Sequence, residues 1–303
     1  MIHQCPICER ESQGIERKRG WFTHFLCGEC QTAVLISSEG EPAYPDDYFG
    51  EGDAKFSGMA GAARKRWHSG RARVVAEVGQ AASSRSIYDI GCGDGAFLSA
   101  CKREGFEVAG CEPQERAREQ ARKNLGCRID GDLFSEAPVN SLDIVTAWQV
   151  IEHVENPGEM IRKIHDYLKP GGLFAVSTVN LSSWQARIFG SLWLHLDPPR
   201  HLWVGHRSQV EHLLERNGFT IERRRWNHLE FGPIGYVDSL VNVFDHKRDR
   251  ILKCLKTGFP GIPNKISWLA AAVITPPALI LSTVEACFSA SATFELYARR
   301  RNS

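Results

Sequence analysis

A strand-to-helix corner with three glycines at alternate positions constrains this chain more than any other feature. Ile87 to Ile90 is a short apolar run typical of a buried strand, and a helix is predicted from Ala96 onward. Gly91, Gly93 and Gly95 lie between them. Glycine permits a sharp turn and lets a ligand approach the backbone, and the N-terminus of the following helix attracts anionic groups. The pattern predicts a nucleotide-binding corner, with an ordinary strand-to-helix loop as the alternative.

Alternating strands and helices continue on both sides of this corner. The predicted strands are Phe106 to Cys111, Cys127 to Ile129, Leu142 to Trp148, Leu173 to Thr178, Phe219 to Trp226 and Thr293 to Ala298. Most are separated by segments with helical periodicity, which favours a mostly parallel sheet covered by helices. The fold class predicted is therefore α/β, a doubly wound sheet of the Rossmann-like kind.

Four of the ten cysteines form two close pairs near the start of the chain. Cys5 and Cys8 make one C-x2-C pair, Cys27 and Cys30 make the other, and 18 residues separate the pairs. This spacing is typical of a zinc ribbon, in which four thiolates hold one tetrahedral ion. Redox pairs or disulfides are the alternative. No apolar leader follows Met1, so we expect a reducing, cytoplasmic location, which favours zinc.

The composition divides the chain into four predicted parts. We expect a zinc ribbon at 1–45, a core at 46–230, an apolar helical insertion at 231–292, and the final strand with a basic tail at 293–303. Glu41 to Pro45 is polar and rich in proline, as a linker would be. The formal net charge of +1 argues against general nucleic-acid binding. The basic stretch from Arg64 to Arg73 is interpreted as a solvated helix face.

The insertion contains a long uncharged run, Ile266 to Val284. Its length permits a membrane span, but Pro276 and Pro277 interrupt it and Glu285 follows. Two interpretations stay open. One is an element that lies at the membrane surface, peripheral to the inner face, with basic residues against anionic lipid; the other is a buried helical hairpin.

Five features in order resemble class I S-adenosylmethionine-dependent methyltransferases. They are Tyr88-Asp89-Ile90-Gly91-Cys92-Gly93-Asp94-Gly95, Glu112 at the end of the second strand, Gly131-Asp132, the stretch from Gln149 to Asn156-Pro157, and Leu168-Lys169-Pro170-Gly171-Gly172. Joined to an N-terminal zinc ribbon, this core also resembles bacterial methyltransferases of polysaccharide and deoxysugar pathways.

The resemblance implies a cofactor, S-adenosyl-L-methionine, and the residues that bind it. Those residues are Asp89, Gly91, Gly93, Gly95, Glu112, Asp132, Leu133 and Gln149. The glycines would pass under the methionine portion, and Asp89 would hold its ammonium group. Glu112 would accept hydrogen bonds from the two ribose hydroxyls, which suits an acceptor-only carboxylate. Asp132 and Leu133 would meet the adenine, and Gln149 would close the site.

A dinucleotide site is the rival interpretation of the same corner. Gly91, Gly93 and Ala96 satisfy the dinucleotide fingerprint, and Glu112 lies at the expected distance along the chain. The Asp89 before the first glycine and the later family elements favour the methyl donor.

Two histidines are candidates for the acceptor side. His153 follows Glu152 at the predicted sheet edge, and the same Glu-His pair occurs in methyltransferases of ubiquinone biosynthesis, where it is associated with a divalent metal. Gln149 stands here at the position of the first acid in that pattern. His201 lies in an aromatic segment that resembles a motif of glycan-pathway relatives, and it is the first choice for a base or a contact to the acceptor. Either histidine could instead be structural.

The predicted function is methyl transfer from S-adenosylmethionine to a small or lipid-linked acceptor, with a sugar or glycan intermediate as the first choice. A quinone-like aromatic is the second acceptor class, and a non-catalytic binding module on the same fold is the non-enzymatic rival. Nucleic-acid methylation is disfavoured, because Trp148-Gln149-Val150-Ile151 stands where a base-flipping motif would follow the strand.

Overall fold

The computed structural model describes residues 2–19, 22–38, 58–79, 85–133, 139–227, 230–244 and 265–302. Its centre is a seven-stranded sheet with the order β11-β12-β9-β8-β5-β6-β7. The strands are β5 (Ser86–Ile90), β6 (Glu107–Cys111), β7 (Ile129–Asp130), β8 (Leu142–Trp148), β9 (Leu168–Val179), β11 (Phe219–Asn227) and β12 (Thr293–Arg300). Strands β5 to β9 pair in parallel, whereas β12 is antiparallel to both of its neighbours.

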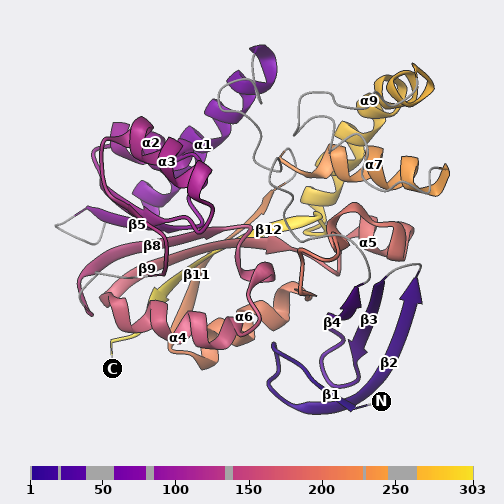
Figure 1. The fold of residues 1–303 in the computed structure, drawn as a ribbon, viewed down its shortest axis with the longest axis horizontal. Coiled ribbons are helices and arrows are strands. Elements are labelled where there is room, and N and C mark those ends of the chain that lie inside the picture. Colours follow the sequence, from indigo (N-terminus) through magenta and orange to yellow (C-terminus); the bar gives the residue numbers. More distant parts are fainter. Residues whose placement is uncertain are drawn as a thin grey trace.

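Helices cover both faces of this sheet (Figure 1). Helices α1 (Gly58–Val78), α2 (Ala96–Arg103) and α3 (Glu115–Leu125) lie on one face, and α4 (Pro157–Tyr167) and α6 (Arg207–Arg216) lie on the other. The predicted α/β, doubly wound architecture is confirmed. The order of the strands reverses beside β5, which places the glycine corner at the switch point where such sheets bind ligands.

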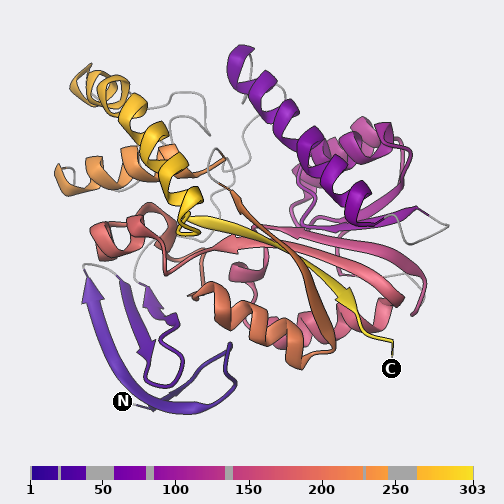
Figure 2. The ribbon, with the colours of Figure 1, turned by 180° about the vertical axis from the view of Figure 1, so that it is seen from behind.

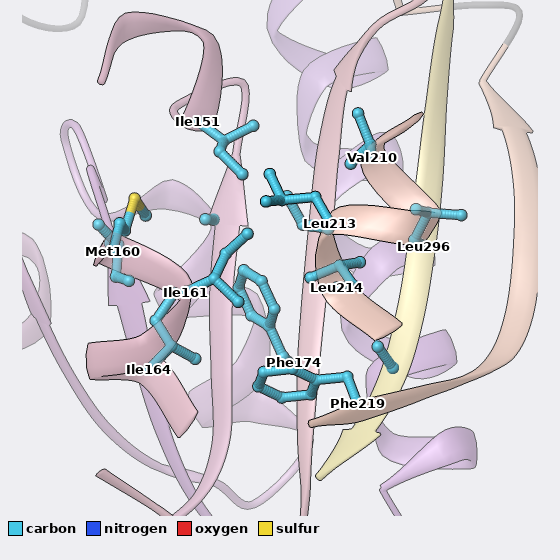
Figure 3. Packing of buried hydrophobic residues seen from close by; sticks show 14 of the residues in the cluster. Ile151, Met160, Ile161, Ile164, Phe174, Val210, Leu213, Leu214, Phe219 and Leu296 are labelled. Atoms are coloured by element: carbon cyan, nitrogen blue, oxygen red, sulfur yellow. The ribbon is translucent and has the colours of Figure 1, made fainter. Parts of the chain in front are cut away.

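The largest apolar cluster lies between the sheet and the pair α4 and α6 (Figure 3). Ile161 and Ile164 of α4 and Leu213 of α6 are fully buried there against Phe174 of β9 and Phe219 of β11. These side chains recur at helical spacing, so each helix presents one apolar stripe to the sheet. This packing fixes the carboxyl ends of β8 and β9, which carry the second half of the candidate site.

Residues 2–19 and 22–38, called the N-terminal module below, supply four strands of a second, smaller sheet. Its strands are β1 (Ile2–Gln4), β2 (Glu11–Arg19), β3 (Phe22–Cys27) and β4 (Ala33–Ser38), in that order. The fifth strand, β10 (Trp203–Val204), comes from the later part of the chain, between β9 and α6, and pairs antiparallel with β4. Figure 2 shows the module from behind, on the side of the sheet that α6 covers. The predicted boundary at residue 45 and the linker Glu41 to Pro45 lie outside the described residues.

In the sequence, two helices connect β11 to β12, the last two strands of the central sheet. They are α7 (Gly232–Phe244) and α9 (Lys265–Cys287), and they pack against each other through a small apolar cluster that contains Val237 and Ala278. The chain returns through β12, where Thr293 pairs with Asn227 and Arg300 with Phe219. Both strands lie where the sequence predicts them. The run Ile266 to Val284 lies within α9 and contains Pro276 and Pro277. Among the described residues, no helix is both long enough and apolar enough to span a membrane.

Candidate active site

The glycine corner connects β5 to α2 with a tight left-handed backbone. Gly91 and Gly95 have φ angles of 68° and 78°. A Cβ would lie 2.7 Å from Val150 at Gly91 and 2.9 Å from Leu125 at Gly95, so a side chain at either position would be both strained and crowded. Around Gly93 no atom lies within 4 Å of the added Cβ. The backbone at Gly93 therefore borders open space that a ligand can enter.

Asp89 lies directly below this corner at the end of β5. Its side chain is 2% exposed, and its Oδ1 accepts a hydrogen bond of 2.6 Å from the Thr146 hydroxyl of β8. Burial raises the pKa of Asp89 to about 7, although the Thr146 bond and the positive charge of Arg71 lower it. A positively charged ligand group beside this carboxyl would favour its ionised form.

Glu112 follows β6 and faces the glycine loop. Its Oε2 accepts a hydrogen bond from Gly93 N–H and its Oε1 accepts one from Gln114 N–H, both at 2.9 Å. Burial raises the pKa of Glu112, and the two backbone N–H groups oppose this effect. The carboxylate thus holds the loop and keeps further lone pairs for a hydroxyl-bearing ligand.

A cavity of about 190 Å³ lies over the corner. Four predicted cofactor residues line it, namely Asp89, Gly91, Gly93 and Gln149. Gly95, Glu112, Asp132 and Leu133 do not line this cavity. Asp132 and Leu133 follow β7, and Leu133 packs against the large apolar cluster. Sequence reasoning did not identify six further lining residues, which are Arg64, His68, Arg71, Trp148, Glu230 and Phe231.

Helix α1 closes one side of the cavity with polar side chains. Arg64 donates two hydrogen bonds to the Asp94 carboxylate, of 2.6 and 2.8 Å. His68 is largely buried, which lowers its pKa to about 3, and its Nδ1 has no hydrogen-bond partner among the described residues. An uncharged imidazole with a free ring nitrogen is therefore available to a ligand in the cavity.

Arg71 is the second cation on α1 that faces the cavity. Its guanidinium is 2% exposed and pairs with Glu230 at 2.7 Å and Glu295 at 2.9 Å. It also lies 4.4 Å from the ring centre of Trp148 and 5.3 Å from that of Trp67. The prediction of a solvated basic face is wrong for Arg71, because this side chain is buried. The acids that neutralise it come from distant parts of the chain, so the local pattern does not reveal the burial.

A second polar cluster lies beyond Gln149, between the ends of β8 and β9. It contains Glu152 and His153 of the short helix η2 (Ile151–His153) and His201, and one ligand atom from each lies within 4.8 Å of the others. The two imidazole rings are 4.8 Å apart, centre to centre. The structure therefore brings together the two histidines that the sequence singles out. His201 Nε2 is also 4.0 Å from Asp197.

Backbone carbonyls fix the orientation of both rings. His153 Nδ1 lies 2.8 Å from Arg200 C=O, and His201 Nδ1 lies 2.8 Å from His195 C=O. A carbonyl can only accept, so each Nδ1 carries its proton and each Nε2 of the neutral ring is the basic nitrogen. Burial lowers the pKa of His201 to about 3 and keeps it uncharged at neutral pH.

Gln149 connects the cofactor cavity to this cluster. When its amide nitrogen faces Glu152, it donates to Oε1 at 3.2 Å while its oxygen accepts from Ser177 Oγ at 3.2 Å. Glu152 is fully buried and accepts a second bond, of 3.0 Å, from the Thr178 hydroxyl. The sequence-predicted role of Gln149 at the edge of the cofactor site is consistent with this position.

The four cysteines of the N-terminal module also converge. The four sulfur atoms lie within 4.8 Å of one another; Cys5 and Cys30 are 3.5 Å apart, and Cys8 and Cys27 are 3.8 Å apart. A larger cavity, of about 550 Å³, lies where this module meets the N-terminus of α4. None of the predicted cofactor or catalytic residues lines it.

The family of methyltransferase domains matches residues 59–223, more than half of the chain. The chain belongs to this family, and the prediction of a class I S-adenosylmethionine-dependent methyltransferase domain is confirmed.

Two curated relatives carry the same name. A ubiquinone biosynthesis O-methyltransferase from Ruegeria pomeroyi is 37% identical over 162 residues, which cover 46% of this chain and 65% of the relative. One from Bordetella avium is 29% identical over 185 residues, which cover 56% of this chain and 76% of that relative. The chain thus spans less than two thirds of the Ruegeria protein.

Solved structures share the fold at low sequence identity. A S-adenosylmethionine-dependent methyltransferase from Archaeoglobus fulgidus has a TM-score of 0.51 and 19% identity, covering 82% of this chain and 97% of its own. The [4+2]-cyclase SpnF has a TM-score of 0.50 and 19% identity, and the match covers 78% of this chain and 81% of SpnF. These likenesses show the fold, which hosts more than one chemistry.

Proposed function

We propose that this protein transfers a methyl group from S-adenosylmethionine to a hydroxyl group of a small or lipid-linked acceptor. The observation that carries the proposal is the open space at Gly93, within a methyltransferase domain. Buried Asp89 lines the cavity there, and Glu112 accepts a hydrogen bond from Gly93 N–H. The cofactor supplies an electrophilic methyl group when bound. The enzyme then needs mainly to hold donor and acceptor in line and to exclude water.

The donor site uses the residues around the corner. Asp89 attracts the ammonium group, and Glu112 binds the ribose hydroxyls with the lone pairs that Gly93 and Gln114 leave unused. Asp132 and Leu133 contact the adenine from the end of β7. Their assignment rests on the family motif, because neither lines the cavity above the corner.

The acceptor class we favour is a quinone-like aromatic hydroxyl rather than a sugar. Support comes from the curated relatives, which are named for O-methylation in ubiquinone biosynthesis. The sugar or glycan acceptor that the cysteine-bearing N-terminus suggested is the second candidate. A phenolic hydroxyl must lose its proton to become a good nucleophile, so this chemistry calls for a base.

The paired histidines supply that base. His153 is partly exposed and presents Nε2 as its basic nitrogen, so it receives the proton. His201 is buried and uncharged, and it contacts the acceptor or stabilises His153 from the side. Glu152 lies beside both rings and favours the imidazolium that forms.

A radiolabel assay tests this function. The protein is incubated with S-adenosylmethionine labelled in the methyl group and with either a polyprenyl-substituted catechol or a panel of sugar nucleotides. We expect label in the catechol, formation of S-adenosylhomocysteine, and neither product with Glu112→Ala. Label only in a sugar nucleotide would refute the acceptor class, and bound cofactor without transfer to either would refute the acceptor proposal altogether.

We also propose that the four cysteines hold one structural zinc ion. Four thiolates 2.3 Å from a tetrahedral ion would lie about 3.8 Å from one another, and the observed 3.5 and 3.8 Å fit this spacing. Cys5 and Cys27 are fully buried. Four protein ligands leave no coordination position open, so the ion would stabilise the module without taking part in the reaction.

Finally, we propose that α9 contacts the membrane surface from the cytoplasmic side. Val273 and Ile280 of α9 are each 66% exposed, and Phe288 just beyond it is 68% exposed. Between Lys265 and Glu285 the helix carries no charged residue. Phe231 lines the cofactor cavity directly before α7, so membrane contact here would place lipid-linked acceptors near the site.

Liposome flotation tests this contact. We expect the protein to float with vesicles that contain anionic lipid, and the double variant Ile280→Asp/Phe288→Asp to remain at the bottom. Ile15→Asp is the control, because Ile15 is 59% exposed on the N-terminal module and its loss should leave flotation unchanged. Equal flotation of all three proteins would remove α9 as the contact.

A further inference from the structure

The N-terminal module shares its sheet with the segment that carries His201. Strand β10 pairs with β4, and next to this pair Leu35 N–H donates a hydrogen bond of 2.8 Å to Leu202 C=O. The module is thus not a separate appendage, because the fifth strand of its sheet, β10, follows shortly after His201 in the chain.

The same short segment also bonds to the cluster that contains Glu152. Leu202 N–H donates to Glu152 C=O at 2.9 Å, and the buried Trp203 donates from Nε1 to Val154 C=O at 3.2 Å. Leu202 is therefore held between β4 on one side and η2 on the other. His201 directly precedes it, so the position of the His201 ring relative to Glu152 depends on both contacts.

The cysteine site in turn fixes where β4 begins. Cys27 N–H donates to Thr32 C=O at 3.0 Å, and Gln31 N–H donates to Cys27 C=O at 2.9 Å. The Thr32 hydroxyl lies 3.2 Å from Cys30 Sγ. The turn that presents two of the sulfur atoms therefore ends directly before β4, the strand that contains Leu35.

We propose that the N-terminal module is a positioning element for the acceptor side of the active site, in which the cysteine site sets β4 and β4 sets His201. The proposal rests on the proposed function for the role of His201. No described residue of the module lines the cofactor cavity. A disturbed module should therefore displace His201 while S-adenosylhomocysteine still binds.

The substitution Leu35→Pro removes the N–H that bonds to Leu202, and Leu35→Ala keeps it. Leu35 is only partly buried, so the alanine variant is a matched control for the lost side chain. Three properties are measured in the full chain: metal content, affinity for S-adenosylhomocysteine by calorimetry, and the imidazole signals of His201 by nitrogen-15 NMR over a pH titration. His201→Gln identifies those signals.

We expect Leu35→Pro to keep its metal and to bind S-adenosylhomocysteine within about twofold of the unmodified protein, because no described residue of the module lines the cofactor cavity. Its His201 signals should shift or broaden, and those of Leu35→Ala should not. Chelation of the metal in the unmodified protein is the second arm, and it should change the His201 signals in the same direction.

Unchanged His201 signals in both the proline variant and the chelated protein would overturn the proposal. If Leu35→Pro loses its metal, the His201 signals of the chelated unmodified protein decide whether the module positions His201. If the native protein contains no metal, the zinc assignment fails, and the comparison of the proline and alanine variants still decides whether β4 positions His201. Absence of S-adenosylhomocysteine binding to the unmodified protein would refute the proposed function instead.

Discussion

Replacing Asp89 by asparagine measures how much the ionised carboxylate below the glycine corner destabilises the folded protein. The side chain is 2% exposed, and burial raises its pKa from 3.8 to about 7. At about 1.4 kcal/mol per pKa unit, the folded protein disfavours the ionised carboxylate by roughly 4 kcal/mol relative to the unfolded chain. An asparagine side chain has nearly the same shape and can still accept the Thr146 hydrogen bond, but it cannot ionise.

The sign of the pH dependence follows from the direction of the shift. Because the folded-state pKa lies above the unfolded-state value, the stabilising contribution of the protonated group is present below pH 3.8 and is lost as the pH rises toward 7. Asp89→Asn avoids this loss. We expect its advantage in free energy of unfolding to grow by about 2–3 kcal/mol between pH 5 and pH 8.

Urea denaturation of both proteins at pH 5 and pH 8 measures this difference. Asp94→Asn is a control of opposite sign, because burial alone would raise the pKa of Asp94 but its two hydrogen bonds from Arg64 lower it. This control should be destabilising by the same amount at pH 5 and pH 8, because the pKa of Asp94 lies below 3.8 in the folded protein, and its effect should shrink only below pH 3.8. An Asp89→Asn effect that is absent, or equal at both pH values, would refute the electrostatic reasoning. The variant should also bind S-adenosylhomocysteine less tightly, since its ammonium group loses a charged partner.

Three further predictions follow from the sites described. Glu112→Ala should weaken S-adenosylhomocysteine binding at least 100-fold in calorimetry, roughly the loss of two charged hydrogen bonds, and an unchanged affinity would remove Glu112 from the cofactor site. His153→Gln should lower turnover about 100-fold and leave cofactor affinity unchanged, whereas normal turnover would show that His153 is not the base. The purified protein should contain one zinc per chain, and chelation should remove hydrogen-exchange protection from residues 2–38 but not from β5 or β8; retained protection would contradict a structural role for the metal.

Local sequence signals predict the parts of the site that come from single turns and strands. The alternating glycines, the acid at the end of β6 and the two cysteine pairs are each defined by a few neighbouring residues. Short-range sterics and strand hydrophobicity determine such features, so they can be predicted without knowledge of the rest of the chain.

Other features depend on contacts between residues far apart in sequence. Arg71 belongs to a basic stretch that resembles a solvated face, and only its pairing with Glu230 and Glu295, 159 and 224 residues away, shows that it is buried. Strand β10 contains two residues and has no periodicity of its own. Its pairing with β4 depends on how the module packs on the core, which no local pattern indicates.

Calorimetric titration of the purified protein with S-adenosylhomocysteine, with NAD as the comparison, tests the central claim most directly. We expect micromolar binding of S-adenosylhomocysteine and no binding of NAD, since Asp89 can pair with the ammonium group of the former and the family match covers the whole corner. Binding of NAD alone would identify the corner as a dinucleotide site, and no binding of either ligand would contradict a cofactor-dependent methyltransferase.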